Sequence, residues 1–194
     1  MVKEYDLTIG SGQQGLYVDP AYGSSKFGII GLEKLDGICY VKEATQYERP
    51  SPSAMIDIVV AKARQFGSHC KVDSAHPGFI RDLIDKNIPA VAVEFRKELS
   101  NMTIESAQAV KERRVLIHPI FRELIAQMRA VRFNEKGHPD KKELTFDLGD
   151  ALMMGLNDMK TNTYKSIGIT QDGKIIDPDR ERKSSLILNT EKFE

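Results

Sequence analysis

Three short stretches of the sequence place aspartate residues where divalent-cation chemistry needs them. Asp19 ends the apolar run "GLYV", and Asp73 ends the short run "CKV". Asp147 and Asp150 lie three residues apart in "TFDLGDALMMGL", so both fall on one face of a predicted helix. Carboxylates that gather without a counter-charge repel one another, and a bound divalent cation removes this repulsion. The pattern predicts a shared cation site, provided that the fold brings these stretches together.

The residue types favour magnesium or manganese as the cation. Carboxylate oxygens are hard ligands, and neither the cysteines nor the histidines have the spacing of a zinc site. Two such ions about 4 Å apart are the arrangement that hydrolyses phosphodiesters in line, with one ion activating water and the other stabilising the leaving oxygen. Simpler interpretations stay open: Asp147 as the N-cap of its helix, Asp150 as a favourable charge near that N-terminus, and Asp19 and Asp73 as turn formers.

The elements that must position these aspartates are predicted to form an α/β fold. The sequence opens with three predicted strands, and the Asp36-Gly37 pair between the last two is a hairpin signal. Strands and helices then alternate, which favours a mixed sheet with helices on both faces and with Asp19 and Asp73 at the ends of neighbouring strands. The predicted strands are residues 15–19, 27–33, 38–44, 70–73, 90–95 and 115–118, and the predicted helices are residues 53–66, 77–87, 103–113, 119–129 and 147–160.

The chain is expected to form one main domain with a small appendage. Residues 1–160 are predicted to be the domain, and residues 161–194 a C-terminal hairpin around "QDGK" with a flexible tail. The segment "GITQDGKI" is one residue short of a nucleotide-binding P-loop. Isoleucine follows its lysine where that motif needs Ser or Thr, and no helix is predicted after it, so we expect no nucleotide there.

The charge balance excludes attraction of a polyanion by the molecule as a whole. The 194 residues include 28 Lys+Arg and 28 Asp+Glu, so a DNA partner would have to be met by a local basic patch. No stretch of about 18 apolar residues exists, and Glu4 and Asp6 stand where a signal peptide needs basic residues, so the chain is expected neither to span a membrane nor to be secreted. Cys39 and Cys70 are predicted to be buried free thiols in a reducing compartment.

The order of elements and the acidic motifs together resemble the C-terminal nuclease domain of the large terminase subunit of tailed viruses. The resemblance runs from about residue 15 to residue 160. Its first motif is "YVDPAYGSSKFGIIG", its second is "VDSAHPGFIRDLIDKNIPAVAVEFRKEL", and its third is "VLIHPIFRELIAQMRAVRFNEKG" followed by "TFDLGDALMMGL". The resemblance implies a ribonuclease H-like fold, an α/β mixed sheet with helices on both faces.

The same resemblance implies an activity: a metal-dependent endonuclease that cuts concatemeric viral DNA during genome packaging. Asp19, Asp73 and Asp150 would be the catalytic metal ligands, with Asp147, where many members have histidine, as an additional ligand. The implied cofactors are two Mg²⁺ or Mn²⁺ ions. The implied partners are double-stranded DNA, an ATPase motor domain, the small terminase subunit and the portal protein, in the host cytoplasm and without a membrane. The chain would then be an excised domain or a separately encoded nuclease subunit.

Basic residues near the predicted site are weaker candidates for DNA contact. Lys97, with Arg96, follows a predicted strand, and the others cluster around the polar excursion "NEKGHPDKK". Each is equally explained as part of a solvated rim. The candidates are Lys97, Arg129, Arg132, Lys141 and Lys142.

Two other functions stay open at this stage. One is a structure-selective nuclease or resolvase of the same fold, which would prefer branched DNA. The other is a non-catalytic docking module of a packaging motor that binds DNA or protein and uses its aspartates only as caps and turns. Loss of divalent-ion stabilisation on changing Asp19 to Asn would distinguish an enzyme from a docking module.

Overall fold

The computed structural model describes most of the chain. The described residues are 1–20, 26–67, 69–135, 137–140, 146–161, 168–169 and 175–176. They belong to two compact units, Met1–Thr161 and Asn162–Glu194. Lys141 and Lys142, two of the basic candidates, lie outside the described residues.

The first unit begins with the antiparallel meander that the sequence predicts. It consists of β1 (Gln13–Asp19), β2 (Phe27–Leu35) and β3 (Ile38–Tyr47). Asp36 and Gly37 connect β2 to β3 with φ angles of 50° and 80°. Two successive positive φ angles are what a tight hairpin turn requires, which explains why this Asp-Gly pair is a reliable signal.

Three further strands complete a six-stranded mixed sheet. β4 (Cys70–Asp73) pairs in parallel with β1, β5 (Ala90–Val93) pairs in parallel with β4, and β6 (Val115–Leu116) pairs in parallel with β3. The strand order is β5-β4-β1-β2-β3-β6. The α/β fold class predicted from the sequence is therefore confirmed.

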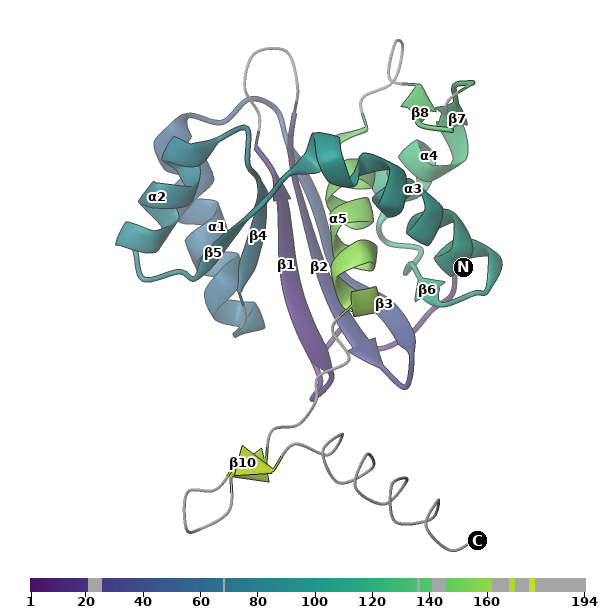
Figure 1. Cartoon of the computed structure of the whole chain (residues 1–194), viewed down its shortest axis with the longest axis horizontal. Coiled ribbons are helices and arrows are strands. Elements are labelled where there is room, and N and C mark those ends of the chain that lie inside the picture. The colour runs from purple at the N-terminus through teal and green to yellow at the C-terminus, as the bar shows by residue number, and fades with distance from the viewer. Residues whose placement is uncertain are drawn as a thin grey trace, which may run out of the picture. The chain divides into compact units, whose positions relative to one another are not determined.

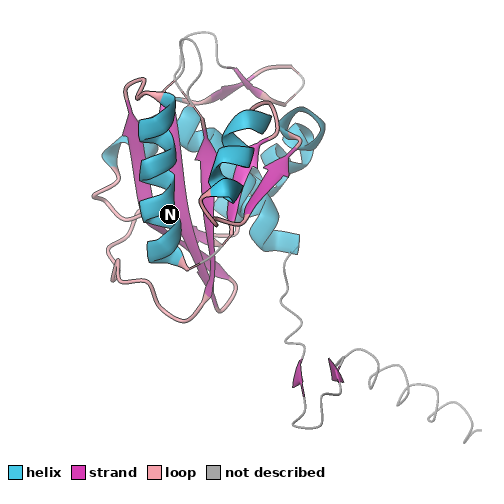
Figure 2. Ribbon diagram, turned by 90° about the vertical axis from the view of Figure 1, so that its left-hand side faces the viewer, coloured by secondary structure: helices cyan, strands magenta, loops and turns pink. Residues whose placement is uncertain are grey.

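Helices cover both faces of the sheet, as Figures 1 and 2 show. α1 (Pro52–Phe66) and α2 (Pro77–Asp85) pack on one face, and α3 (Phe95–Lys111), α4 (Arg122–Ala130) and α5 (Asp147–Thr161) pack on the other. Among the described residues, no helix combines the length and the apolar character needed to cross a membrane.

The alternation of side chains along the strands explains this division into two cores. Leu16 and Val18 of β1 are buried with Ile29 of β2 against α1 and α2. Tyr17 and Ile30, which alternate with them, are buried against α3 and α5. Because successive residues of a strand point to opposite faces, the central strands are apolar on both sides.

α3 begins eight residues earlier than predicted. The sequence predicts a strand over residues 90–95 and a helix only from Thr103, but pairing ends at Val93 and the helix begins at Phe95. Phe95, Leu99 and Met102 are spaced as one helical face and all pack into the core beside α5. This packing extends the helix through residues whose local pattern is ambiguous.

α4 begins later than predicted. The sequence predicts a helix from Pro119, but a turn precedes Arg122. The Phe121 N–H donates to the His118 carbonyl at 3.0 Å, and the Ile120 N–H donates to His118 Nδ1 at 3.2 Å. These two bonds hold the residues before Arg122 in a turn. The preceding strand is also shorter than predicted, since it covers Val115–Leu116 and does not reach His118.

Two small antiparallel pairs complete the secondary structure. β7 (Arg132–Phe133) pairs with β8 (Pro139–Asp140) in the polar excursion before α5. In the second unit, β9 (Gly168–Ile169) pairs with β10 (Ile175–Ile176), on either side of the predicted "QDGK" hairpin, which itself lies outside the described residues.

The N-terminal segment lies along the end of the sheet that carries β6. Val2 forms a parallel bridge with Ile117, just after β6. The Lys3 N–H donates to the Ile117 carbonyl at 3.1 Å, and the Ile117 N–H donates to the Met1 carbonyl at 2.8 Å. The chain beyond β6 is thus already paired by its own N-terminus.

Both cysteines are buried and free, as predicted. Burial raises the pKa of the Cys39 thiol to about 11 and raises that of the Cys70 thiol further. Neither thiol is therefore a nucleophile at neutral pH.

Candidate metal centre

β1 and β4 bring the first two predicted aspartates together. Their parallel register pairs Val18 with Val72, and one further step along both strands leads to Asp19 and Asp73. Neighbouring strands lie about 4.8 Å apart, so the two carboxylates project from adjacent positions. The two aspartates thus end neighbouring strands, as predicted, and their role as ligands stays a prediction.

Both aspartates face the helix layer that contains α5. Tyr17 and Lys71 stand two residues before Asp19 and Asp73, and both bond to Asp158 of α5. The Tyr17 O–H donates to Oδ2 of Asp158 at 2.8 Å, and Lys71 Nζ donates to Oδ1 at 2.5 Å. Residues two apart on a strand share a face, so Asp19 and Asp73 also lie on the side of α5.

The polar contacts around Asp158 fix α5 to two strands. His69 Nε2 also lies 3.4 Å from Oδ2, and Asp158 is only 5% exposed. Tyr17, His69, Lys71 and Asp158 are termed the Asp158 cluster. Burial raises the pKa of Asp158, but the three hydrogen bonds outweigh it and lower that pKa below the ordinary 3.8. Asp158 is therefore ionised at neutral pH and holds α5 to β1 and β4.

Gly28 brings the first turn of α5 next to Asp19. Gly28 is the antiparallel partner of Asp19 on β2. A Cβ at Gly28 would lie 2.9 Å from the carbonyl carbon and oxygen of Asp147 and 3.2 Å from the Leu148 nitrogen. The absence of a side chain at Gly28 thus allows the helix backbone to rest directly on the sheet. Through this contact the fold gathers Asp73, Asp19 and the N-terminus of α5 along one line across three strands.

Gln127 of α4 caps this helix terminus. Its Oε1 accepts hydrogen bonds from the N–H groups of Leu148 and Gly149 at 3.1 and 3.2 Å, and its Nε2 donates to Gln46 of β3 at 2.6 Å. Gln127 is 5% exposed. Because these two first-turn donors are bonded to Gln127, capping by Asp147 is not needed to explain how the helix begins.

The donor set fits a hard divalent cation. Asp147 and Asp150 are each 6% exposed, and with Asp19 and Asp73 they offer only carboxylate oxygens. Within the described ranges, no three His, Cys, Asp or Glu side chains stand close enough to bind one ion in their present rotamers. The backbone places Asp19 and Asp73 on adjacent paired strands, beside the first turn of α5, which carries Asp147 and Asp150.

The basic candidates are placed in two regions. Lys97, in the first turn of α3, forms an ion pair with Glu94. Arg129, in the last turn of α4, and Arg132, in β7, are both exposed and lie near one another in the sequence. Both side chains of this ion pair are exposed, and the DNA contact of Lys97 stays a prediction.

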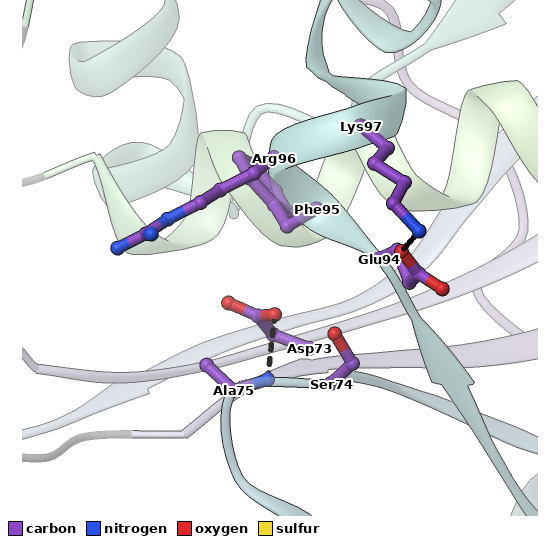
Figure 3. A pocket seen from close by; sticks show the side chains of 7 residues that line it. All are labelled: Asp73, Ser74, Ala75, Glu94, Phe95, Arg96 and Lys97. Carbon is purple, nitrogen blue, oxygen red and sulfur yellow. Dashed lines mark hydrogen bonds and ion pairs between the residues drawn. The ribbon is translucent and has the colours of Figure 1, made fainter.

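A pocket of about 600 Å³ opens beside Asp73. Asp73–Ala75, at the end of β4, form one side, and Glu94 with the first turn of α3, Phe95–Lys97, forms the other (Figure 3). The Ala75 N–H donates to Oδ1 of Asp73 at 3.0 Å and so orients this carboxylate. The position of Arg96 across the pocket from Asp73, visible in Figure 3, has no signature in the sequence beyond its charge.

His76, next to this pocket in the sequence, has an altered pKa. Desolvation lowers its pKa below the ordinary 6.5, although the charge of Asp73 acts in the opposite direction. His76 is therefore predominantly neutral at pH 7 and adds no fixed positive charge to the site.

Solved structures share this fold, whereas no family model and no curated protein sequence matches the chain. The large terminase of the thermophilic bacteriophage D6E, also solved in complex with ADP, matches with a TM-score of 0.66 and 14% identity, over 79% of this chain and 41% of that one. The nuclease domain of the bacteriophage SPP1 large terminase, with bound Mn, matches with a TM-score of 0.61 and 15% identity, over 82% of this chain and 96% of that domain.

A third match is the large terminase nuclease of the thermophilic phage G20c with bound magnesium. It has a TM-score of 0.61 and 12% identity, over 74% of this chain and 79% of that one. The chain thus spans less than half of the D6E terminase but nearly all of the SPP1 nuclease domain. The chain has the ribonuclease H-like α/β fold of large terminase nuclease domains, and the resemblance found in its sequence is confirmed at the level of the fold.

Proposed function

We propose that this protein is a metal-dependent DNA endonuclease that cuts concatemeric viral DNA during genome packaging. Asp19, Asp73 and Asp150 are the proposed ligands of two Mg²⁺ or Mn²⁺ ions, and Asp147 is a proposed additional ligand. The observation that carries the proposal is the alignment of Asp19 and Asp73 on the face of the sheet against which the first turn of α5 rests. Carboxylates that share one region repel one another, a bound divalent cation removes this repulsion, and a cation site on this fold suits phosphodiester hydrolysis.

The chain's own residues would contribute rigidity and orientation. Divalent cations, when bound, supply a water of lowered pKa and stabilise charge on the phosphoryl oxygens. Asp19 and Asp73 project from paired strands, and the Ala75 N–H fixes one oxygen of Asp73. Asp150 projects from a helix that is held at its N-terminus by Gln127 and near its C-terminus by the Asp158 cluster. Rigid placement of ligands lowers the reorganisation needed to reach the transition state.

The solved neighbours support the cofactor and the wider assembly. Bound Mn in the SPP1 domain and bound magnesium in the G20c nuclease favour these two ions for this chain. Complexes of the D6E large terminase with ADP favour an ATPase motor domain as a partner of residues 1–160, which we propose to be the nuclease domain. Double-stranded DNA, the small terminase subunit and the portal protein are the remaining proposed partners, in the host cytoplasm.

Cleavage of supercoiled plasmid tests the proposal. The parent chain, Asp19→Asn and Asp150→Asn are compared in Mn²⁺, Mg²⁺ and EDTA. Asp57→Asn is the matched control, because Asp57 is exposed on α1, on the opposite face of the sheet. We expect nicking and linearisation by the parent and the control in Mn²⁺, and loss of both in the two site variants.

The alternative functions predict other outcomes in the same experiment. No cutting by any of the four proteins, together with DNA or protein binding that Asp19→Asn leaves unchanged, would favour a docking module. Faster cutting of a four-way junction than of linear duplex would favour a resolvase. Equal cutting by Asp19→Asn and the parent would contradict the ligand assignment.

A further inference from the structure

The pocket beside Asp73 lies at the carboxyl ends of β4 and β5. These strands are parallel neighbours, and the helices that follow them pack on opposite faces of the sheet. α2, which follows β4, packs with α1 through Phe79 and Leu83. α3, which follows β5, packs with α5 through Met102 and Ala109. Adjacent parallel strands whose connections run to opposite faces leave a crevice beyond their carboxyl ends, and such crevices are where sheets of this type bind ligands. The pocket is thus a consequence of the topology.

The two basic side chains that line this pocket differ in whether they form an ion pair. Lys97 forms an ion pair with Glu94, so their charges offset each other. Arg96 is exposed, and its side chain has no hydrogen bond or ion pair to any residue in the described part of the chain. Its side chain extends along the pocket on the side opposite Asp73, and Ser74 lies on the same side as Asp73 (Figure 3). Arg96 is therefore the cationic side chain of this pocket without an ion pair in the described part of the chain, and it lies across the pocket from the Asp73 carboxylate.

We infer that this pocket seats a phosphate of the DNA strand that is cut, next to the scissile phosphate, with Arg96 as its partner. The inference rests on the proposed nuclease function, because Asp73 is what relates the pocket to the scissile bond. A volume of about 600 Å³ exceeds what a single phosphate needs and accommodates a nucleotide unit. Arg96 is a positioning residue in this scheme, since it holds the strand and takes no part in the bond change.

A backbone phosphate explains the lining better than a base does. The planar guanidinium of arginine matches two phosphate oxygens with two parallel hydrogen bonds. A cation in the first turn of a helix is disfavoured by the helix dipole, and a bound anion offsets that cost. Contacts to phosphate carry no sequence information, so the pocket would position any DNA sequence in the same way.

DNA binding in EDTA tests the inference without any catalysis. The probe is a fluorescein-labelled 20-base-pair duplex, measured by anisotropy over a series of salt concentrations. We expect Arg96→Ala to weaken binding about tenfold at low salt and to reduce the slope of log K against log salt by about one. Arg96→Lys, which keeps the charge but not the planar fork, should weaken binding less and keep the slope.

A matched control separates this pocket from general loss of positive charge. Arg64 is exposed in the last turn of α1, at the opposite end of β4 from Asp73, so Arg64→Ala should bind like the parent. Equal binding by Arg96→Ala and the parent, or equal loss in Arg64→Ala, would overturn the inference. So would the absence of any binding by the parent in 50 mM salt.

The DNA-binding test of the pocket and the plasmid-cleavage test of the nuclease can fail independently of each other. If the parent cuts plasmid but Arg96→Ala binds the duplex normally, the pocket assignment fails and the nuclease proposal stands. If the parent cuts nothing in Mn²⁺ but Arg96→Ala loses the expected binding, the pocket stands as a DNA phosphate site and the nuclease proposal fails.

Discussion

Replacing Gly28 with alanine should damage both the stability and the activity of the protein. The added methyl group would meet the carbonyl of Asp147 at 2.9 Å, and ordinary contacts begin near 3.4 Å, so the first turn of α5 must move by about 0.5 Å. The obstructing atoms belong to the helix backbone and have no rotamer to change. Overpacking of this kind costs about 1–3 kcal/mol. Because Asp147 and Asp150 move with the helix, plasmid cleavage should fall at least about tenfold.

The measurements are urea unfolding and plasmid cleavage of Gly28→Ala beside Gly78→Ala. Gly78 lies in α2, where an added Cβ meets nothing within 4 Å, so alanine there should stabilise the protein by up to about 1 kcal/mol. This control keeps the same chemical change and removes the steric conflict. Gly28→Ala with parental stability and parental cleavage would refute the contact between α5 and β2 as the device that positions the site.

Three further changes test other parts of the structure. Asp158→Asn should destabilise the protein by about 1–3 kcal/mol at pH 7. Burial raises the pKa of Asp158, but its hydrogen bonds lower it below 3.8, so the stability that the Asp158 carboxylate contributes is present above pH 3.8 and is lost as the pH falls through the lower folded value. The urea midpoints of parent and variant should therefore converge as the pH falls below 3.8, and a constant gap would contradict this. Gln127→Ala should lose about 1–3 kcal/mol in urea unfolding, since two N–H groups at the start of α5 lose their acceptor, and an unchanged midpoint would contradict the capping. Cys39 and Cys70 should resist a thiol reagent at pH 8 in the folded protein and react together in urea, whereas fast labelling of the native state would contradict their burial.

The positions of the four aspartates on strands and on a helix could be predicted from the sequence. Asp19 and Asp73 directly follow apolar runs, so locating the strands also located the aspartates. Asp147 and Asp150 share a helix whose apolar spacing is clear. These predictions succeed because each depends on local periodicity, together with one assumption about which strands are neighbours.

The supports of the site depend on contacts between distant segments, and no local pattern encodes them. Gln127 is one polar residue in an amphipathic helix, and only the packing of α4 against α5 makes it a cap. In the sequence, Gly28 is only a small residue in an apolar strand, and its importance follows from its contact with the α5 backbone at Asp147. The distinction between Lys97 and Arg96 likewise requires knowing that Glu94 pairs with Lys97 and leaves Arg96 to face the pocket.

The lengths of the outer strands bear on how this sheet avoids self-association. The long strands β2 and β3 lie inside the sheet, whereas β5 at one edge has 4 residues and β6 at the other has 2. The chain just beyond β6 is already bonded to the N-terminal segment through Ile117. Short or covered edges provide few free backbone groups on which another copy could add a strand. The six-stranded sheet thus carries little risk of edge-to-edge aggregation, even where many copies are concentrated in one place.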